Sequence, residues 1–437
     1  MKISVIGCGY LGAVHAASMA ELGHEVVGID VDPVKIKTLT AGRAPFFEPG
    51  LVEILQSGRA SGRLCFSTDI ADAAGAQVHF VAVGTPQRRG ENAADLSYVD
   101  AAVESLLPYL GPDDVVVGKS TVPVGTAQVL AARLRAAGSS AALAWNPEFL
   151  REGFAVRDTI RPDRLVYGVE PGDNGLRATA ALNEVYAHAL GLDTPVVVTD
   201  YATAELVKVA ANAFLATKIS FINAMAEVAE VAGADVTALA DALGHDLRIG
   251  RRFLNAGIGF GGGCLPKDIR AFTARAEELG RGQSVGFLKE VDQINLRRRQ
   301  RMVELVVEGF GGQVYERKVA VLGLAFKPNS DDVRDSPALD VAVRLHGLGA
   351  DVVATDPAAI PNSISLHPQL GYASRTQDAL TGADAVVLVT EWDEYRGLDP
   401  VHTAGLVKHP LIFDGRNVLD PVAWRDAGWT YVGMGRP

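Results

Sequence analysis

The stretch KISVIGCGYLG, residues 2–12, decides the fold of this chain. Residues 2–6 predict a strand, the glycines predict a tight turn, and residues 13–22 predict a helix. The next predicted strand, residues 25–30, ends in Asp30, 18 residues beyond Gly12. A strand, a GxGxxG turn, a helix and an acidic strand end in this order are typical of a dinucleotide-binding βαβ unit.

The glycines of this turn let a pyrophosphate approach the helix N-terminus, and Asp30 is suited to accept hydrogen bonds from the adenosine ribose. An acidic residue there disfavours the 2′-phosphate of NADP, so we expect NAD as the cofactor. Lys35 is either a ribose contact or an ordinary solvated lysine, and Cys8 is a small filler. The expected contacts are Gly7, Gly9, Tyr10, Leu11, Gly12, Asp30 and Lys35.

Short apolar runs alternate with helical stretches through the N-terminal half of the chain. The runs are continuous rather than alternating, which indicates a parallel sheet covered on both faces. After the first two, they fall at residues 78–83, 115–118, 143–145, 165–169 and 195–198.

Residues 201–231 contain neither proline nor glycine and predict one long helix. A helix of about 30 residues is about 45 Å long, which suits a connector, a dimer interface, or both. A second helical stretch covers residues 285–308.

Strand–helix alternation resumes after a linker at residues 311–313, with strands at 318–323, 351–355, 385–389 and 411–413 and a helix at 336–348. The predicted fold class is therefore α/β, with two Rossmann-like doubly wound domains joined by a long central helix and a helical middle domain. The predicted domains are 1–199 for NAD, 200–309 for the helical centre, and 310–437 for the second Rossmann-like unit.

The composition of the chain excludes several classes of protein. The chain has 437 residues, 48% of them hydrophobic, and a net charge of −11, which argues against nucleic acid or an anionic membrane as the main partner. Its three cysteines show no paired spacing, so we expect no disulfide framework, no metal site and a reducing, cytoplasmic compartment. The chain has no window of 18 uninterrupted apolar residues, so we expect no transmembrane helix.

Polar residues follow several predicted strands, where open α/β sheets bind ligands. Thr85 and Thr121 are candidate cofactor contacts, although a single threonine there is more often a turn residue. The segment NPEFLREG, residues 146–153, brings Glu148 and Glu152 four residues apart. In a helical turn they would share a face and could position water or act as general acid or base.

Further along, Lys208 and Asn212 are one helical turn apart, either a donor pair for an oxyanion or part of a solvated face. The loop GFGGGCLPKD, residues 259–268, places Cys264 at a predicted helix start beside Lys267 and before Asp268. The dipole and the lysine favour the thiolate there, as a nucleophile requires.

Arginines suited to diphosphate recognition precede this loop, among them Arg248, and surface solubility is the alternative reading. Lys327, Arg334 and Arg416 fall at strand ends of the second unit. That unit has GLAF, residues 323–326, where a dinucleotide fingerprint needs its glycines, so we expect no second NAD there.

The NAD fingerprint, NPEFLREG, ELVKxxxN, FGGGCLPKD and the second Rossmann unit, in this order, resemble the UDP-glucose/GDP-mannose dehydrogenase family. The resemblance implies oxidation of the C6 alcohol of a nucleotide sugar to a carboxylate with two NAD and one water. The variant FLNAG, residues 253–257, is similar to the UDP-glucose branch. The departure is Gly263, where family members often carry Ser or Tyr.

The resemblance also implies roles for single residues. Cys264 would capture the C6 aldehyde as a thiohemiacetal that becomes a thioester, while Lys208 and Asn212 would stabilise the oxygen charge at C6. Asp268 would assist with a water, Glu148 would serve thioester hydrolysis, and Thr121 would help to hold that water. Glu152 would lie near the nicotinamide, and Lys267 and Arg334 would contact NAD. The UDP-sugar contacts would be Glu148, Phe149, Leu150, Arg151, Glu152, Lys208, Asn212, Arg248 (from a neighbouring subunit), Phe253, Leu254, Asn255, Ala256, Gly257, Gly261, Lys327 and Arg416.

The sequence thus predicts a cytoplasmic, dimeric, NAD-dependent dehydrogenase that converts UDP-glucose to UDP-glucuronate, a polysaccharide precursor. Alternatives are the same reaction on GDP-mannose or a UDP-hexosamine, and a two-electron hydroxyacid dehydrogenase that also uses a Lys–Asn pair. A non-catalytic nucleotide-sugar sensor is a further alternative, but it has no reason to retain Cys264, Lys208 and Asp268 together.

Overall fold

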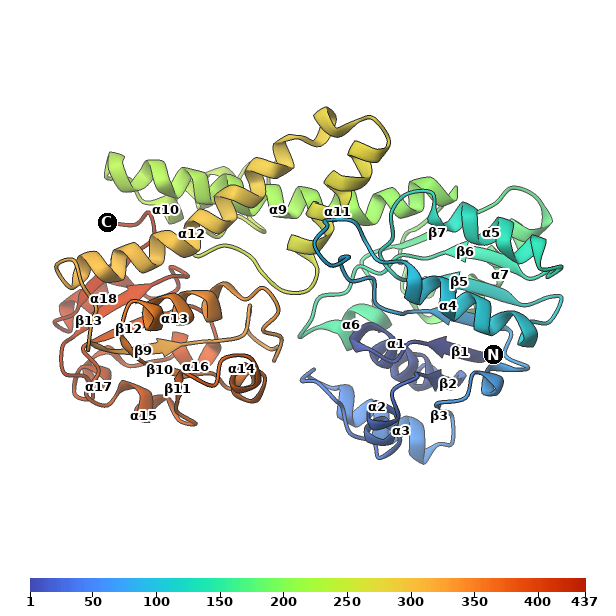
Figure 1. Ribbon diagram of the computed structural model, residues 1–437, viewed down its shortest axis with the longest axis horizontal. Coiled ribbons are helices and arrows are strands. Elements are labelled where there is room, and N and C mark those ends of the chain that lie inside the picture. Colours follow the sequence, from blue (N-terminus) through green and yellow to red (C-terminus); the bar gives the residue numbers. More distant parts are fainter. The chain divides into compact units, whose positions relative to one another are not determined.

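The computed structural model describes residues 1–437, which form two compact α/β units (Figure 1). The first unit comprises Met1–Ala211 and Ala274–Gly280, and the second comprises Asn212–Thr273 and Arg281–Pro437. Each unit has its own mainly parallel sheet. The predicted fold class, with two Rossmann-like sheets and a long helix, is confirmed.

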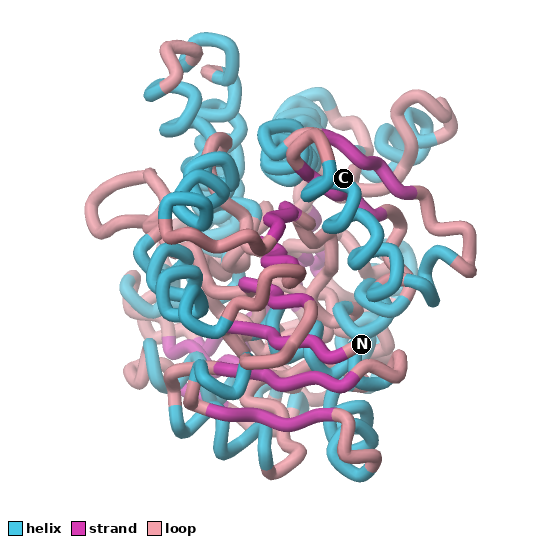
Figure 2. The backbone as a smooth tube through the Cα atoms, turned by 90° about the vertical axis from the view of Figure 1, so that its right-hand side faces the viewer, coloured by secondary structure: helices cyan, strands magenta, loops and turns pink.

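The first unit is built on an eight-stranded sheet in the order β3-β2-β1-β4-β5-β6-β7-β8. The first six strands follow the Rossmann order, in which the chain reverses direction across the sheet between β1 and β4. Figure 2 shows strands of this sheet side by side, with helices around them. The strands are β1 (Lys2–Ile6), β2 (Glu25–Ile29), β3 (Leu64–Ser67), β4 (Val78–Val81), β5 (Val115–Gly118), β6 (Ala142–Trp145), β7 (Leu165–Val169) and β8 (Val196–Thr199).

One pair of strands departs from the parallel sheet that the apolar runs predict. β7 runs antiparallel to β6, with Ala144 opposite Val169, whereas β7 and β8 are parallel to each other. The connection between β6 and β7 contains only the short helix α6 (Ala155–Ile160) and does not cross back to the other end of the sheet. β7 therefore starts where β6 ends and must return in the opposite direction.

Helix α1 (Tyr10–Glu21) illustrates how this unit packs. It buries a run of mostly small residues, Gly12–Ala20, so that it lies close to the sheet beside α3 and α6. The other helical segments of the unit are α2 (Pro33–Thr40), α3 (Leu51–Ala60), η1 (Ile70–Ala73), α4 (Ser97–Leu106), η2 (Leu107–Tyr109), α5 (Thr126–Ala136), α7 (Asp173–Val185) and α8 (Ala187–Leu190).

The second unit contains a six-stranded, fully parallel sheet in the order β11-β10-β9-β12-β13-β14, again the Rossmann order. Its strands are β9 (Lys318–Leu322), β10 (Asp351–Thr355), β11 (Gly371–Tyr372), β12 (Ala385–Leu388), β13 (Leu411–Asp414) and β14 (Thr430–Gly433). After the long helix α9 (Tyr201–Ala232), the helical segments are α10 (Val236–Gly244), α11 (Leu265–Glu278), η3 (Gly282–Val285), α12 (Phe287–Gly309), α13 (Pro337–Gly347), α14 (Ile360–Leu366), α15 (Thr376–Leu380), α16 (Asp393–Arg396), α17 (Pro400–Ala404) and α18 (Pro421–Asp426). The residues of α11 from Ala274 onward belong to the first unit.

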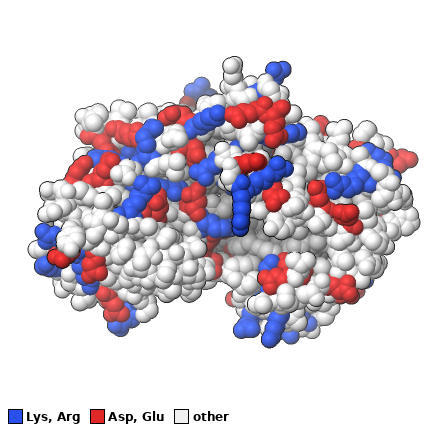
Figure 3. All heavy atoms as spheres, in the orientation of Figure 1, with Lys and Arg blue, Asp and Glu red and all other residues white.

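The predicted long helix is confirmed as α9 (Tyr201–Ala232), 32 residues in length. By length and composition alone it is the one helix that could cross a membrane, although 44% of its most apolar window is buried inside the protein. On the face shown in Figure 3, acidic and basic side chains are mixed rather than gathered by sign. The net negative charge is therefore not concentrated on that face.

Candidate active site

The GxGxxG turn has the geometry of a phosphate cradle. Gly7 has φ +91°, and an added Cβ would lie 2.8 Å from Val83 Cγ1. At Gly12 an added Cβ would come within 1.8 Å of the Gly7 carbonyl oxygen, so any side chain there would force the turn apart. Gly9 caps α1 without a side-chain hydrogen bond, and nothing would meet a Cβ there. The helix start therefore has open space beside Gly9 and no side-chain cap, and N–H groups at such a helix start are suited to a pyrophosphate.

Asp30 closes the same site at the end of β2. Its Oδ2 accepts from Cys8 N–H at 2.8 Å and from Lys35 Nζ at 2.8 Å, and its Oδ1 accepts from Asp32 N–H at 3.0 Å. Burial, with Asp30 as the second cause, raises the pKa of the Cys8 thiol, so Cys8 stays a neutral filler. Lys35 pairs with the acid that is expected to bind ribose, which favours its placement beside the cofactor.

Glu48 was missed by the sequence analysis, yet it fastens two parts of this site together. Its carboxylate accepts from the Tyr10 hydroxyl and from the N–H groups of Gly153 at 2.6 Å and Ala155 at 2.7 Å. Tyr10 belongs to the glycine turn, and Gly153 ends the NPEFLREG segment. The only local signal was an acidic residue before Pro49-Gly50, and that signal does not identify a partner about 100 residues away.

The candidate threonines come together at the strand ends. Thr85 donates its hydroxyl to the Thr121 carbonyl at 2.7 Å, which joins the loops after β4 and β5. Lys119, which sequence reasoning also missed, lies buried just before them and donates to Asn146 Oδ1 at 3.0 Å and the Tyr186 hydroxyl at 3.1 Å. Burial lowers the pKa of Lys119 to about 8.

The NPEFLREG segment is not helical over residues 146–150, so the helical reason for pairing Glu148 with Glu152 is wrong. Glu148 instead accepts from Lys208 Nζ at 3.1 Å and from Leu150 N–H at 2.7 Å. Phe149 lies between two cations, with the Arg164 guanidinium 3.8 Å and Lys208 Nζ 5.6 Å from its ring centroid. The segment therefore wraps around Lys208, whose side chain is only 7% exposed.

Two other residues of this segment have different surroundings. Arg151 is exposed and forms a bidentate pair with Asp158 of the following helix α6, at 2.8 Å and 2.7 Å. Glu152 is buried beside Gly153. Leu11 is half-buried and packs against the core of the unit.

Cys264 lies at the start of α11 in the second unit, as expected. Its carbonyl accepts from Asp268 N–H at 2.9 Å, and its side chain is exposed. Asp268 is buried and accepts from Asn212 Nδ2 at 2.6 Å and from Lys267 Nζ at 2.7 Å. The structure thus brings an exposed thiol, a buried carboxylate, an amide and an ammonium to one helix start.

The glycines before Cys264 are required by close packing. An added Cβ would lie 2.2 Å from the Asp335 carbonyl oxygen at Gly261 and 2.8 Å from the Phe326 ring at Gly262. At Gly263, where the sequence departs from the family pattern, the space is filled by the Arg334 guanidinium, 2.4 Å from an added Cβ. The glycine loop therefore packs directly against residues 326–335, between β9 and α13.

Arg416 follows β13 and reaches the same loop. Its guanidinium donates to the carbonyls of Gly259 at 2.8 Å, Val389 at 2.8 Å and Phe326 at 3.3 Å. Lys327 lies 5.2 Å from the centroid of the Phe326 ring. Arg334 is largely exposed and held bidentately by Asp332, with Nε 2.9 Å from Oδ1 and Nη2 2.6 Å from Oδ2. Three cations thus border one edge of the C-terminal sheet.

The FLNAG segment packs against Arg416 and its neighbours. Gly257 donates its N–H to Asn223 Oδ1 at 2.9 Å, and an added Cβ there would lie 2.5 Å from the Gly415 carbonyl. Phe253 has φ +66°, an uncommon conformation for an aromatic residue. Leu254 and Ala256 are buried, and Asn255 accepts from Arg251 at 2.7 Å.

Arg248 is not part of this group: its side chain is 89% exposed and pairs with Asp246.

The candidate residues therefore fall into two sets. The dinucleotide turn, Asp30, the two threonines, Glu148 and Lys208 belong to the first unit, whereas Asn212, Cys264, Asp268, Lys327 and Arg416 belong to the second. Most of these residues lie at the carboxyl ends of parallel strands or at a helix start, whereas Lys208 and Asn212 lie inside α9.

Comparisons with known proteins match most of the chain. Three domains described for the UDP-glucose/GDP-mannose dehydrogenase family match in order: the NAD binding domain over residues 1–190, the central domain over 202–297 and the UDP binding domain over 320–421. A UDP-glucose 6-dehydrogenase of Rhizobium meliloti (strain 1021) is 43% identical over 440 residues, with all of both chains covered.

Two solved structures are similar over the whole chain. A UDP-glucose dehydrogenase from Pyrobaculum islandicum has 40% identity and a TM-score of 0.89, covering 100% of this chain and 98% of that one. A UDP-D-ManNAc dehydrogenase from Pyrococcus horikoshii has 26% identity and a TM-score of 0.86, covering 100% and 99%.

Proposed function

Because this chain belongs to the UDP-glucose/GDP-mannose dehydrogenase family, we propose that it oxidises UDP-glucose at C6 to UDP-glucuronate, consuming two NAD and one water per sugar. The observation that carries this proposal is an exposed thiol, Cys264, at the start of α11 beside buried Asp268, in a chain that also has a dinucleotide turn. A simple alcohol dehydrogenase needs no such nucleophile.

The residues of the dinucleotide turn would hold NAD, which supplies a hydride acceptor in each of two oxidations. We assign the pyrophosphate to Gly7, Gly9, Tyr10, Leu11 and Gly12, and the ribose to Asp30 and Lys35. Thr85, Thr121 and Glu152 are assigned to the nicotinamide side, with Lys267 and Arg334 as further contacts from the second unit.

The chemistry requires four changes at C6: an oxidation, addition of the thiol, a second oxidation and a hydrolysis. The alcohol first loses a hydride and a proton and becomes an aldehyde. The Cys264 thiolate then forms a C–S bond with the aldehyde carbon, and loss of a second hydride from this thiohemiacetal leaves a thioester. Water adds to the thioester carbonyl, the C–S bond breaks, and a carboxylate, a thiol and a proton are released.

Donors on α9 are assigned to the oxygen at C6. Lys208 and Asn212 stabilise the negative charge that develops there, and each is already held by an acid, Glu148 for Lys208 and Asp268 for Asn212. We assign Glu148, with Thr121, to the water of the hydrolysis step, and Asp268 to proton transfer through a water near the thiol.

The UDP-sugar is assigned to the remaining candidates: Phe149, Leu150, Arg151, Arg248 of a second copy, Phe253, Leu254, Asn255, Ala256, Gly257, Gly261, Lys327 and Arg416. Arg416 and Lys327 supply positive charge that a diphosphate requires. The proposed division into 1–199, 200–309 and 310–437 follows these roles.

The first test is the amount of NADH formed per sugar. With NAD in excess and UDP-glucose limiting, absorbance at the NADH band should indicate two NADH per UDP-glucose, whereas one would mean that oxidation stops at the aldehyde. GDP-mannose, UDP-galactose and UDP-N-acetylmannosamine serve as alternative substrates. A hexosamine preference would assign the chain to a function like that of the Pyrococcus horikoshii relative.

The second test is Cys264→Ser. The alcohol of serine is a far weaker nucleophile than a thiolate, so turnover should fall by about 10³-fold or more while UDP-glucose still binds. Cys65→Ser, at the other exposed cysteine, is the matched control and should behave as wild type. Unchanged turnover in Cys264→Ser would sink the nucleophile assignment, and absence of NADH from every sugar would favour a sensor.

We also propose that the protein is a homodimer packed through α9. Phe214, Phe221 and Val228 repeat every seven residues and are 67%, 48% and 56% exposed, an apolar stripe that a second copy of α9 would cover. A protein partner fits better than a membrane because charged residues of α9 have protein partners: Glu205 accepts from Gly125 and Ala127 N–H groups. Sedimentation at micromolar concentration tests this. The three cysteines form no disulfide, which fits the cytoplasmic location that we propose.

A further inference from the structure

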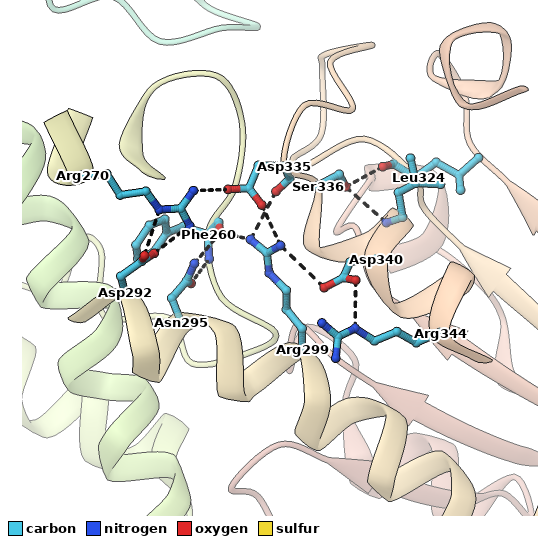
Figure 4. A network of polar contacts seen from close by, with 11 residues as sticks. Phe260, Arg270, Asp292, Asn295, Arg299, Leu324, Asp335, Ser336, Asp340 and Arg344 are labelled. Atoms are coloured by element: carbon cyan, nitrogen blue, oxygen red, sulfur yellow. Dashed lines mark hydrogen bonds and ion pairs between the residues drawn. The ribbon is translucent and has the colours of Figure 1, made fainter. Parts of the chain in front are cut away.

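The loop before Cys264 is held by a helix that carries no candidate catalytic residue. Asn295 of α12 is fully buried, and its amide makes two bonds to one residue of the loop (Figure 4). Phe260 N–H donates to Asn295 Oδ1 at 2.7 Å, and Asn295 Nδ2 donates to the Phe260 carbonyl at 2.9 Å. The neighbouring Gly259 leaves no room for a side chain, since a Cβ would lie 2.2 Å from Asn295 Oδ1.

Arg299, one turn further along α12, extends this attachment to the loop before α13 and to α13 itself. Its Nη2 donates to the Phe260 carbonyl at 3.2 Å and to the Asp335 carbonyl at 3.3 Å. Its Nη1 donates to Asp335 Oδ1 at 2.7 Å and lies 3.6 Å from Asp340 Oδ2. Since Arg299 is only 4% exposed, these contacts are shielded from solvent and from salt.

The same network reaches the helix that follows Cys264. Arg270 of α11 pairs bidentately with Asp292 of α12, at 2.9 Å and 3.0 Å, and its Nη1 lies 3.6 Å from Asp335 Oδ2. Asp335 holds an uncommon φ of +47° while bridging the two arginines. The segment that contains Cys264 is therefore attached on both sides, through Phe260 before it and Arg270 after it. Figure 4 shows Phe260 and Arg270 with these partners.

We propose that Asn295 and Arg299 are positioning residues that fix the thiol of Cys264 relative to Asp268 and to residues 326–335 of the C-terminal unit. The expected change in kcat rests on the proposed function, whereas the expected change in the alkylation rate of Cys264 does not. The glycines of residues 259–263 leave that loop little stiffness of its own, so its place must be imposed by contacts from outside. α12 imposes it with hydrogen bonds to a backbone that would otherwise move.

The two oxidations should depend differently on these residues. The first oxidation does not use the thiol, whereas the second requires sulfur within bonding distance of the aldehyde. A misplacement of about 1 Å can cost about 100-fold in rate. Loss of the attachment should therefore slow the covalent step more than the first oxidation or UDP-glucose binding.

The test compares Asn295→Ala, Arg299→Met and Arg299→Lys with the control Arg297→Met. Arg297 lies on the same helix, but it is 49% exposed and pairs only with Glu290 and Glu227. The chemical readout is the rate at which iodoacetamide modifies Cys264 in the ligand-free protein, followed by peptide mass spectrometry with Cys65 as the internal reference. The kinetic readouts are kcat, KM for UDP-glucose, and aldehyde released to a hydrazine trap.

Cys264 is already exposed, so a looser loop would give iodoacetamide little further access to it. The looser loop would instead move the thiol away from the start of α11, which favours the reactive thiolate form. We expect Asn295→Ala and Arg299→Met to react about fivefold more slowly with iodoacetamide, with kcat about tenfold lower, KM within threefold, and aldehyde released. Arg299→Lys should recover part of the rate because it keeps the charge beside Asp335. Arg297→Met should match the wild type in every readout.

An alkylation rate and kcat equal to those of Arg297→Met in the folded Asn295→Ala protein would overturn the proposal. So would a raised KM with unchanged kcat, which would place the residues in sugar binding. If Asn295→Ala does not fold, the proposal is tested by comparing Arg299→Lys with Arg299→Met, and equal rates in the two variants would overturn it. If wild-type protein forms no NADH from any sugar, the proposed function fails while the alkylation comparison still stands.

Discussion

The two Rossmann-like sheets of this protein share a strand order but use the acid at the end of their second strand in different ways. Asp30, after β2, accepts two backbone N–H groups and the half-exposed Lys35. Asp356, after β10, accepts from Leu324, Ala325, Ala358 and Ala359 N–H groups and from the indole of Trp392. The first acid has capacity left for a ligand, whereas the second is saturated by its own chain.

The turns after the first strand of each sheet differ in the same sense as the two acids: one is open to a ligand and the other is not. In the first unit α1 begins at Tyr10, four residues after β1 ends, and the glycines leave its N-terminus open. In the second unit the loop from Gly323 to Ser336 separates β9 from α13, and Ser336 caps the helix. One copy of the fold keeps its helix start for a dinucleotide, while the other uses its loop to support Cys264.

The largest expected effect is that of Asp356→Ala on stability. The change leaves five donors without an acceptor, four of them buried. Unpaired buried donors cost about 1–3 kcal/mol each before relaxation, so a loss of at least about 3 kcal/mol is expected. Three of the four tryptophans, Trp392, Trp424 and Trp429, belong to the second unit, so urea unfolding followed by their fluorescence reports on it.

Asp351→Ala is the matched control, since Asp351 lies at the exposed start of the same strand. Its unfolding midpoint should stay close to that of the wild type, within about 0.5 kcal/mol. An equally small loss in Asp356→Ala would contradict the view that this acid has become structural.

Much of this difference could be predicted from the sequence. The fingerprint at residues 7–12, the missing glycines at 323–326 and the long helix are local patterns, and the structure has the corresponding elements. The edge strands β3, β11 and β14 were missed because they are short or half-exposed and so lack a continuous apolar run. The antiparallel β7 depends on where a loop turns back, which its residues do not encode locally.

The supporting contacts of the site were less predictable. Glu48 reaches Gly153, and Asn295 reaches Phe260, across 105 and 35 residues. A carboxylate or an amide in an ordinary helix or loop has no distinguishing neighbours in the sequence. Such residues are found only when the fold brings their partners to them.

The next largest effect concerns the acid of the first unit. Asp30→Asn keeps a side-chain oxygen for Cys8 N–H but removes the charge that repels a 2′-phosphate. The preference for NAD over NADP, measured as a ratio of dissociation constants by calorimetry, should fall about tenfold, or about 1.4 kcal/mol.

Asp356→Asn is the matched change in the second unit and should leave that ratio unaltered, provided the protein remains folded. A shift of cofactor preference in Asp356→Asn would mean that the second sheet also binds a dinucleotide. The two sheets would then bind the same kind of ligand despite their different sequences.

The smallest expected effect is a difference in acid sensitivity. The first unit buries His15 on α1 against the ring of Phe80, 4.3 Å between centroids, and neither ring nitrogen has a hydrogen-bond partner. Burial, followed by the charge of Lys119, lowers the pKa of His15 well below 6.5. Below pH 6.5 the unfolded chain therefore binds a proton that the folded protein does not, and stability must fall as pH falls.

One such group contributes up to about 1.4 kcal/mol per pH unit below pH 6.5. His15→Leu should remove that part of the loss of thermal stability between pH 7.5 and pH 5.5, while the exposed control His402→Leu should leave it in place. The slope will not vanish, because burial also lowers the pKa of His79 in the same sheet. An unchanged slope in His15→Leu would mean that the acid sensitivity arises from other groups.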